Sequence, residues 1–349
     1  MKLTPRTLAL TLLKLILMVA LLALVLRQVQ WHDVETVNAL GERLVMPGLA
    51  SVLQNLNWLY YGLAAFCLLG SLFTCALRWQ RVLAILGLPF TGREVIRLVF
   101  IGDFFNNFLL GSLGGDAVKV FLAVKSRPHK AVIVTSIFAD RLIGLIGLTV
   151  HASIMLLLLS WQGAIEGRRL WLPAMPIVII SGGLLVGGTL LFASRLHQAL
   201  NLQKLAHRVP MGLHLQQASA SLRLLFGSPR PLLPVLLLTL CCQAFSISTV
   251  VFLGACLDLG LPLIDYLLYV PIIFILSAVP VTPGGIGVLE ELCLLYFAAA
   301  ANPNKVLLLA LLFRLTVLLC SLPGLVAFWG YGQKATAIRS ELEKMEGEE

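Results

Sequence analysis

Charge is scarce in this sequence. Only 12% of the 349 residues are Asp, Glu, Lys or Arg, whereas 59% are hydrophobic and the mean hydropathy is +0.93. A soluble core of this length needs far less apolar surface, which excludes water as the main solvent. The net charge is +9, but most Lys and Arg residues lie between apolar runs, as the positive-inside rule requires, and this argues against nucleic-acid binding.

Histidine and paired cysteine are also scarce. Of the six histidines, only His151 lies inside a predicted span. None of the seven cysteines forms a CxxC pair, and all lie within or at the edge of apolar runs, where they act as small hydrophobic residues. We therefore expect no disulfide framework, no metal site and no cofactor, and we find no nucleophile-and-base motif.

Long apolar runs are what the sequence has instead. The run Leu8–Val29 matches the thickness of a bilayer and is followed by no small-residue cleavage site, so it predicts an uncleaved first span. Five further runs are long enough to cross the bilayer: Trp58–Leu77, Ala131–Leu159, Leu172–Ala193, Leu232–Leu257 and Val306–Gly330. The sequence predicts an all-α polytopic membrane protein with about six spanning helices.

Basic residues between the runs predict the orientation. We assign the cytoplasmic side to the segments that carry Lys2 and Arg6; Arg78, Arg81, Arg93 and Arg97; Lys125, Arg127 and Lys130; and the segment 195–230. Both termini should then be cytoplasmic. The expected location is the plasma (inner) membrane of a bacterium or archaeon.

Two apolar stretches are interrupted by polar residues, glycine and proline. Leu98–Val124 contains the break Asn106 to Asp116, and Leu261–Ala301 contains the break Pro280 to Gly287. Non-helical backbone at membrane depth requires protein or a wet cavity around it, so both stretches are predicted to be re-entrant hairpins, the first entered from the cytoplasm and the second from outside. The alternative is a protein of eight full spans.

The resulting order of elements predicts an inverted repeat. The first membrane half comprises residues 1–160 with its re-entrant segment 98–124. The second comprises residues 161–333 with its re-entrant segment 261–301, and residues 334–349 form a helical cytoplasmic tail. No convincing residue-level identity between the halves is visible in the sequence. The spacing of Val34, Val37, Leu40 and Leu44, and of Leu202, Leu205 and Val209, predicts amphipathic helices at the membrane interface.

Ionisable residues at membrane depth are costly, and each is a candidate functional residue. Asp140 and Arg141 lie about ten residues into a predicted span, near the midplane. Neighbours in a helix point about 100° apart, so these two side chains cannot simply pair with each other. Their partners are expected elsewhere, for example Arg141 with Glu290 or Asp116 with Arg314. Such pairs could be structural or functional.

Each break delivers the start of a helix to the predicted cavity. In the first, Gly114 and Gly115 precede Asp116 and Lys119; in the second, Gly284, Gly285 and Gly287 precede Glu290. Glycines expose backbone N–H groups, and a helix N-terminus favours an anion. Neither break is a P-loop, because the spacing and the Lys-Ser/Thr ending are missing.

Taken together, these elements resemble the flippase-like membrane domain of lysylphosphatidylglycerol synthases and its stand-alone relatives. The resemblance covers nearly the whole chain. It rests on Gly114-Gly115-Asp116 with Lys119, on Asp140-Arg141 with Gly144-Leu145, on Pro283-Gly284-Gly285-Ile286-Gly287 with Glu290, and on the helix of Arg314. Two residues depart from the pattern. Leu110 stands where proline is usual, and Lys119 stands where arginine is usual, which replaces a bidentate phosphate ligand by a point charge.

The resemblance implies movement of an anionic or modified-headgroup lipid between leaflets, in support of lipid or envelope synthesis. The expected headgroup-binding residues are Lys119, Arg141, Arg314, Gly114, Gly115, Gly284, Gly285 and Gly287, with Asp116, Asp140 and Glu290 as charge partners. No catalytic residue and no aminoacyltransferase activity are predicted, because the family's soluble domain does not follow Gly330. Two alternatives remain: an intramembrane lipid-modifying enzyme that uses Asp116, Asp140 and Glu290, or a non-catalytic partner of a lipid or glycan synthase.

Overall fold

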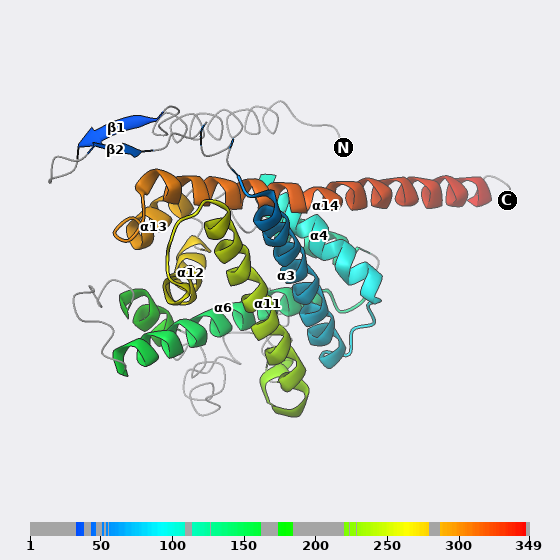
Figure 1. Cartoon of the computed structure of the whole chain (residues 1–349). Coiled ribbons are helices and arrows are strands. Elements are labelled where there is room, and N and C mark those ends of the chain that lie inside the picture. Colours follow the sequence, from blue (N-terminus) through cyan, green and yellow to red (C-terminus); the bar gives the residue numbers. More distant parts are fainter. Residues whose placement is uncertain are drawn as a thin grey trace, which may run out of the picture.

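Long helices dominate the computed structural model (Figure 1). The structure describes residues 33–37, 43–46, 51, 54, 56–108, 114–125, 127–161, 174–183, 220–222, 224–227, 229–278 and 287–346. Within these residues the elements are β1 (Val34–Val37), β2 (Arg43–Met46), α3 (Trp58–Ile85), α4 (Gly92–Phe108), α5 (Gly114–Val124), α6 (Lys130–Trp161), α11 (Pro229–Cys256), α12 (Leu263–Ser277), α13 (Val288–Phe297) and α14 (Pro303–Glu346).

The long helices agree with four of the predicted spans. α3, α6, the Arg230–Cys256 part of α11 and the Pro303–Gly330 part of α14 are each long and apolar enough to cross a membrane. The chain is therefore a multi-pass membrane protein. The predicted span Leu8–Val29 lies outside the described residues, and of Leu172–Ala193 only the helical segment Ala174–Gly183 is described.

The predicted boundary of the second span is wrong, with a consequence for charge. The prediction ended the span at Leu77 and placed Arg78 in a cytoplasmic segment. Instead α3 continues to Ile85, and Arg78 is only 6% exposed within it. Because a carboxylate of another helix pairs with Arg78, this charge can lie inside the helical bundle.

The predicted amphipathic helix at Val34 to Leu44 is also wrong. Residues 34–37 and 43–46 form an antiparallel hairpin that pairs Val34 with Met46 and Val37 with Arg43. β-branched residues favour this extended pairing over a helix. The second predicted interfacial helix, at Leu202 to Val209, lies outside the described residues. The C-terminal tail is helical as predicted, since α14 continues without interruption to Glu346.

Both interrupted stretches have a helix on each side of the break. α4 and α5 flank residues 109–113, and α12 and α13 flank residues 279–286; both breaks lie outside the described residues. α4 and α5 approach closely because two glycines face each other: a Cβ atom on Gly115 would lie 1.8 Å from the carbonyl oxygen of Gly102. Re-entrance from opposite sides of the membrane stays a prediction.

Arg127, which follows α5, contacts residues at the start of α4. Its Nη2 lies 3.0 Å from Oε1 of Glu94, its guanidinium covers the ring of Phe90, and it donates to the carbonyl oxygen of Pro89. Glu94 also accepts from the backbone N–H of Thr91, which caps α4 and, with Arg127, lowers the pKa of Glu94. These contacts fix how α5 leaves the bundle before α6 begins.

Two buried clusters of apolar residues form the core. One gathers around Trp79, Leu83 and Ile101 between α3, α4, α5 and α6. The other gathers around Leu253, Ile272 and Phe297 between α11, α12, α13 and α14. Each cluster therefore belongs mainly to one half of the chain, and α6 contributes to both.

Candidate functional site

A buried ion pair joins α3 to α6. Nε of Arg78 lies 2.8 Å from Oδ1 of Asp140, and Nη2 lies 3.1 Å from Oδ2. Both side chains are nearly inaccessible, at 7% and 11%. This bidentate geometry answers the need for a partner that the sequence predicted for Asp140. Arg78 is the residue that the sequence analysis missed, because a basic residue near the end of an apolar run was assigned to the loop.

The neighbouring Arg141 forms an ion pair with a carboxylate of α5. Its Nε lies 2.8 Å from Oδ2 of Asp116, and its Nη2 lies 3.1 Å from Oδ1. The two side chains differ in exposure: 53% for Arg141 and 15% for Asp116. The predicted pairings of Arg141 with Glu290 and of Asp116 with Arg314 are therefore wrong. Asp116 is the third residue of α5, and the helix dipole stabilises a carboxylate at this position.

Lys119 is the cation of this region that has no ion pair. Its side chain is 7% exposed, and its Nζ lies 3.7 Å from the centre of the Trp79 ring. Within the described part of the chain, no carboxylate forms an ion pair with Lys119. A cation–π contact stabilises a buried ammonium only partly, so Lys119 keeps hydrogen-bonding capacity for an anion.

These groups surround a cavity of about 140 Å³. Arg78, Lys119 and Arg141 contribute positive charge, whereas Asp103, Asp116 and Asp140 contribute negative charge. The remaining lining residues are Leu72, Cys75, Val99, Gly102, Asn106 and Ile137. Asp140 and Arg141 thus both face the cavity, as the sequence predicted. Four of the charged lining residues form ion pairs with each other. Lys119 and Asp103 form none with any described residue.

Glu290 and Arg314 form another pair, on α13 and α14. Nε of Arg314 lies 2.9 Å from Oε1 of Glu290, and Nη2 lies 3.2 Å from Oε2. Glu290 is 3% exposed, and its Oε2 also accepts the backbone N–H of Gly287 at 2.9 Å. Neither residue belongs to the described lining of the 140 Å³ cavity. The structure therefore brings Lys119 and Arg141 together, and it places Arg314 elsewhere.

Two of the glycines proposed as backbone donors, Gly115 and Gly287, already have acceptors. The N–H of Gly115 donates to Oδ1 of Asn106 at 2.8 Å, and that of Gly287 donates to Glu290. Gly114 is the first residue of α5, and Gly284 and Gly285 lie outside the described residues. An incoming anion would have to displace Asn106 or Glu290 to reach these two N–H groups.

Comparison with known proteins places this architecture in a family. No curated protein matches the chain. The model of the family described as Lysylphosphatidylglycerol synthase TM region matches residues 11–324, which include all the ion pairs described above. The chain therefore belongs to the Lysylphosphatidylglycerol synthase TM region family, whose members are membrane proteins related to lipid metabolism.

Proposed function

We propose that this protein moves a lipid with an anionic, phosphate-bearing headgroup between the leaflets of the plasma membrane. The observation that carries the proposal is the cavity in which Lys119 and Arg141 converge between α4, α5 and α6. A phosphate cannot enter hydrocarbon without replacements for its water. An ammonium and a guanidinium supply such replacements. Arg314 lies outside this lining, so the binding site proposed here is restricted to the first half.

Asp116 is suited to act as an internal competitor for the headgroup. Its carboxylate accepts from both Nε and Nη2 of Arg141, the two donors with which arginine binds a phosphate bidentately. In the empty protein this pair neutralises Arg141. A headgroup phosphate that accepts from these donors would release Asp116. Binding would then break the ion pair that joins α5 to α6.

An enzymatic role is the weaker alternative. It requires Asp116, Asp140 or Glu290 to exchange protons with a substrate. Each of these carboxylates accepts both hydrogen bonds from an arginine, which stabilises the ionised form and occupies the oxygens. The geometry supports translocation over acid–base catalysis. A partnership with a separate lipid or glycan synthase is compatible with translocation and concerns the same substrate.

Headgroup transfer in proteoliposomes tests the proposal. We expect Lys119→Gln and Arg141→Gln each to lower the transfer rate of a fluorescent phosphatidylglycerol at least about tenfold, because each removes a charge-assisted contact of about 1.5 to 3 kcal/mol. Lys305→Gln is the matched control: Lys305 is a partly exposed lysine that donates to the carbonyl oxygen of Asp258 and does not line the cavity. Its transfer rate should stay at that of the unchanged protein.

A purely structural role for Arg141 gives a different pattern. In that case Arg141→Gln unfolds the protein, and adding Asp116→Asn restores both the Tm and transfer. On the binding role, the double variant folds but does not transfer. Full transfer by a folded Lys119→Gln/Arg141→Gln protein would refute the proposal.

A further inference from the structure

The two halves of the chain match helix by helix. α3 and α11 have the same length of 28 residues, and Ser71 and Cys242, at equal distances from their starts, are 171 positions apart. The links to α4 and α12 also match in length, since those helices begin at Gly92 and Leu263. Equal lengths of a long helix and of the link that follows it are not expected of unrelated segments.

The loops that follow α3 and α11 have the same conformation. Leu86, Gly87 and Leu88 donate to the carbonyl oxygens of Val82, Ala84 and Leu83. At the matching positions, Leu257, Asp258 and Leu259 donate to those of Leu253, Ala255 and Gly254. Gly87 and Asp258 both have positive φ, +69° and +47°. A glycine meets this requirement easily and an aspartate tolerates it, so the backbone is shared although the residues differ.

Contacts between α3 and α11 are reciprocal. In the helix-by-helix match Ser71 corresponds to Cys242, and Cys75 corresponds to Ser246. Ser71 Oγ contacts Cys242 Sγ at 3.4 Å and Ser246 Oγ at 2.7 Å, while Cys75 Sγ contacts Cys242 Sγ at 2.9 Å. A two-fold axis between the helices produces this exchange of partners. The helices run in opposite directions (Figure 1). The contact between Tyr60 near the start of α3 and Phe252 near the end of α11 shows the same arrangement.

The ion pairs of the short helices match as well. Asp116 and Glu290 are the third residues of α5 and α13, and Arg141 and Arg314 are the twelfth residues of α6 and α14. The partners are 25 and 24 positions apart, and both pairs use Nε and Nη2. We call Asp116–Arg141 the first ion pair and Glu290–Arg314 the second ion pair.

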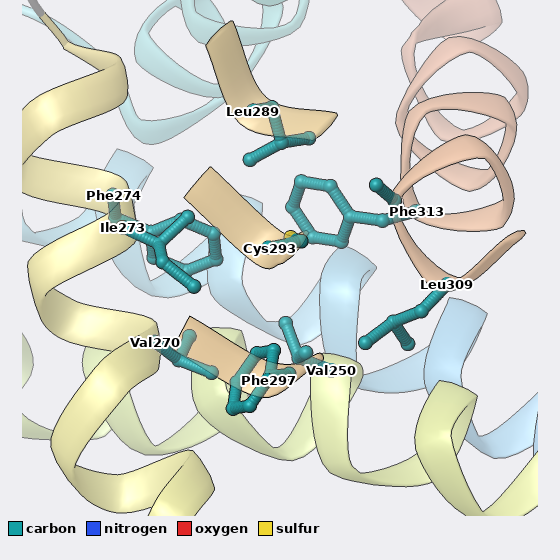
Figure 2. A pocket seen from close by; sticks show the side chains of 10 residues that line it. Val250, Val270, Ile273, Phe274, Leu289, Cys293, Phe297, Leu309 and Phe313 are labelled. Carbon is teal, nitrogen blue, oxygen red and sulfur yellow. The ribbon is translucent and has the colours of Figure 1, made fainter. Parts of the chain in front are cut away.

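A second, apolar cavity lies beside the second ion pair, and we call it the second cavity. It is the counterpart of the 140 Å³ cavity, which we call the first cavity. The second cavity measures only about 10 Å³, and α11, α12, α13 and α14 contribute its side chains (Figure 2). Positions that line both cavities correspond in the match: Val99 to Val270, Gly102 to Ile273, Asp103 to Phe274, Lys119 to Cys293, Ile137 to Ala310, and Asp140 to Phe313. Three charged residues of the first cavity are thus replaced by two phenylalanines and a cysteine.

We infer that the second ion pair is the duplicate of the first and holds the second half closed, and that the headgroup site exists in the first half alone. A cavity lined by Phe274, Cys293 and Phe313 offers an anion no cation and only the weak S–H donor of the cysteine. The retained Glu290–Arg314 pair fastens α13 to α14 just as the first pair fastens α5 to α6. Because the halves are inverted about the axis at Ser71 and Cys242, the second ion pair faces the opposite membrane side. Arg314 is then a positioning residue.

This inference rests on the proposed function only for its headgroup site, and natural cysteines allow the two parts to be tested separately. Cys75 lines the first cavity, and Cys293 lines the second. Two versions of the full chain are prepared, one retaining only Cys75 and the other only Cys293. A water-soluble maleimide measures access in each. We expect Arg141→Gln to speed modification of Cys75 about tenfold, as 1.4 kcal/mol of opening free energy predicts, without changing Cys293. Arg314→Gln should do the reverse.

An anionic probe separates binding from closure. Fluorescent phosphatidylglycerol should slow modification of Cys75 and leave Cys293 unchanged. Equal protection of Cys293 would refute a single headgroup site, and an unchanged Cys293 rate in folded Arg314→Gln protein would refute the second ion pair as a closure. Protection of neither cysteine, with both arginine effects intact, would refute the proposed function and support the duplicated closure. Where Arg314→Gln does not fold, Arg314→Lys keeps the charge, loses the bidentate geometry and should give a smaller increase at Cys293.

Discussion

Arginine–carboxylate pairs of the same geometry have different surroundings in this protein. Arg78 is almost inaccessible, whereas the side chain of Arg141 is 53% exposed. Removing one partner of a buried pair leaves an uncompensated charge, which costs far more than breaking an exposed pair. The surroundings therefore separate a structural arginine from one that is accessible to a ligand.

Thermal unfolding of solubilised protein can measure this difference. Arg78→Gln should lower the stability by about 3 to 5 kcal/mol, because it leaves Asp140 buried and ionised. Arg141→Gln should cost about 1 kcal/mol or less, because the replaced side chain is half exposed and Asp116 still lines the cavity that contains Lys119. The double variant Arg78→Gln/Asp140→Asn should regain part of the loss. Equal shifts in Tm for the two single arginine variants would contradict the assignment.

Asp103 is expected to oppose the headgroup. It lines the cavity as the third carboxylate and forms no ion pair with any residue that the structure describes. Asp103→Asn removes negative charge beside Lys119 and Arg141, so fluorescent phosphatidylglycerol should bind about three- to tenfold more tightly. A fluorescence titration gives the Kd. Asp258→Asn, an exposed change in the loop after α11, is the control and should leave it unchanged. Weaker binding by Asp103→Asn would show that Asp103 supports the site.

The sequence predicted most of these residues and none of their partners. Charges inside apolar runs are visible without a structure, so Asp116, Lys119, Asp140, Arg141, Glu290 and Arg314 could all be named. Pairing depends on which helices lie side by side, and helical periodicity carries no such information. Arg78 was missed for a different reason: a charge at the end of an apolar run is typical of a loop, and only the length of α3 shows otherwise.

At the scale of elements, the close approach of α4 and α5 depends on glycine. A methyl group at Gly115 would collide with the carbonyl oxygen of Gly102 and with the backbone nitrogen of Asn106 at 2.6 Å. Gly115→Ala should therefore separate the two helices and cost about 1 to 3 kcal/mol, as overpacking does. Because α5 carries Asp116 and Lys119, headgroup transfer should fall as well.

Gly62→Ala in α3 provides the matched control. No atom lies within 4 Å of a Cβ atom at that position, and alanine favours a helix by about 0.5 to 1 kcal/mol over glycine. The Tm should stay constant or rise. If both alanine variants unfold at the temperature of the unchanged protein, α4 and α5 do not depend on their glycine contact.

Among the elements, apolar length was a reliable guide and short amphipathic patterns were not. Four long runs became helices at nearly the predicted positions, because bilayer thickness and backbone hydrogen bonding leave few alternatives. Each strand of the segment 34–46 has only four residues, and its valines fit a helix face and a strand equally well. Cross-strand pairing of residues 34–37 with 43–46 decided the outcome, and helical spacing does not reveal such pairing.

The inferred duplication belongs to the scale of the whole molecule, where the order of elements in the sequence indicates it and residue identity does not. Matched positions such as Asp140 and Phe313, or Lys119 and Cys293, have no chemical similarity, so a comparison of residues could not detect them. Helix lengths, loop hydrogen bonds and reciprocal contacts are retained because packing constrains the backbone more strongly than the side chains that line a cavity. Divergence of one cavity agrees with the inference of a single headgroup site.

Inversion makes a prediction about the membrane sides that matched residues face. Gly87 and Asp258 are exposed, occupy equivalent loops and share positive φ, so Gly87→Cys and Asp258→Cys introduce the same probe with similar backbone strain. In a cysteine-free background, an impermeant maleimide should modify position 258 in intact cells. Position 87 should react only after the membrane is opened, because the basic residues around it indicate the cytoplasm. A parallel duplication would expose both positions to the same side. Modification of both cysteines in intact cells, or of neither until lysis, would therefore refute the inverted arrangement and with it the placement of the two ion pairs on opposite sides of the membrane.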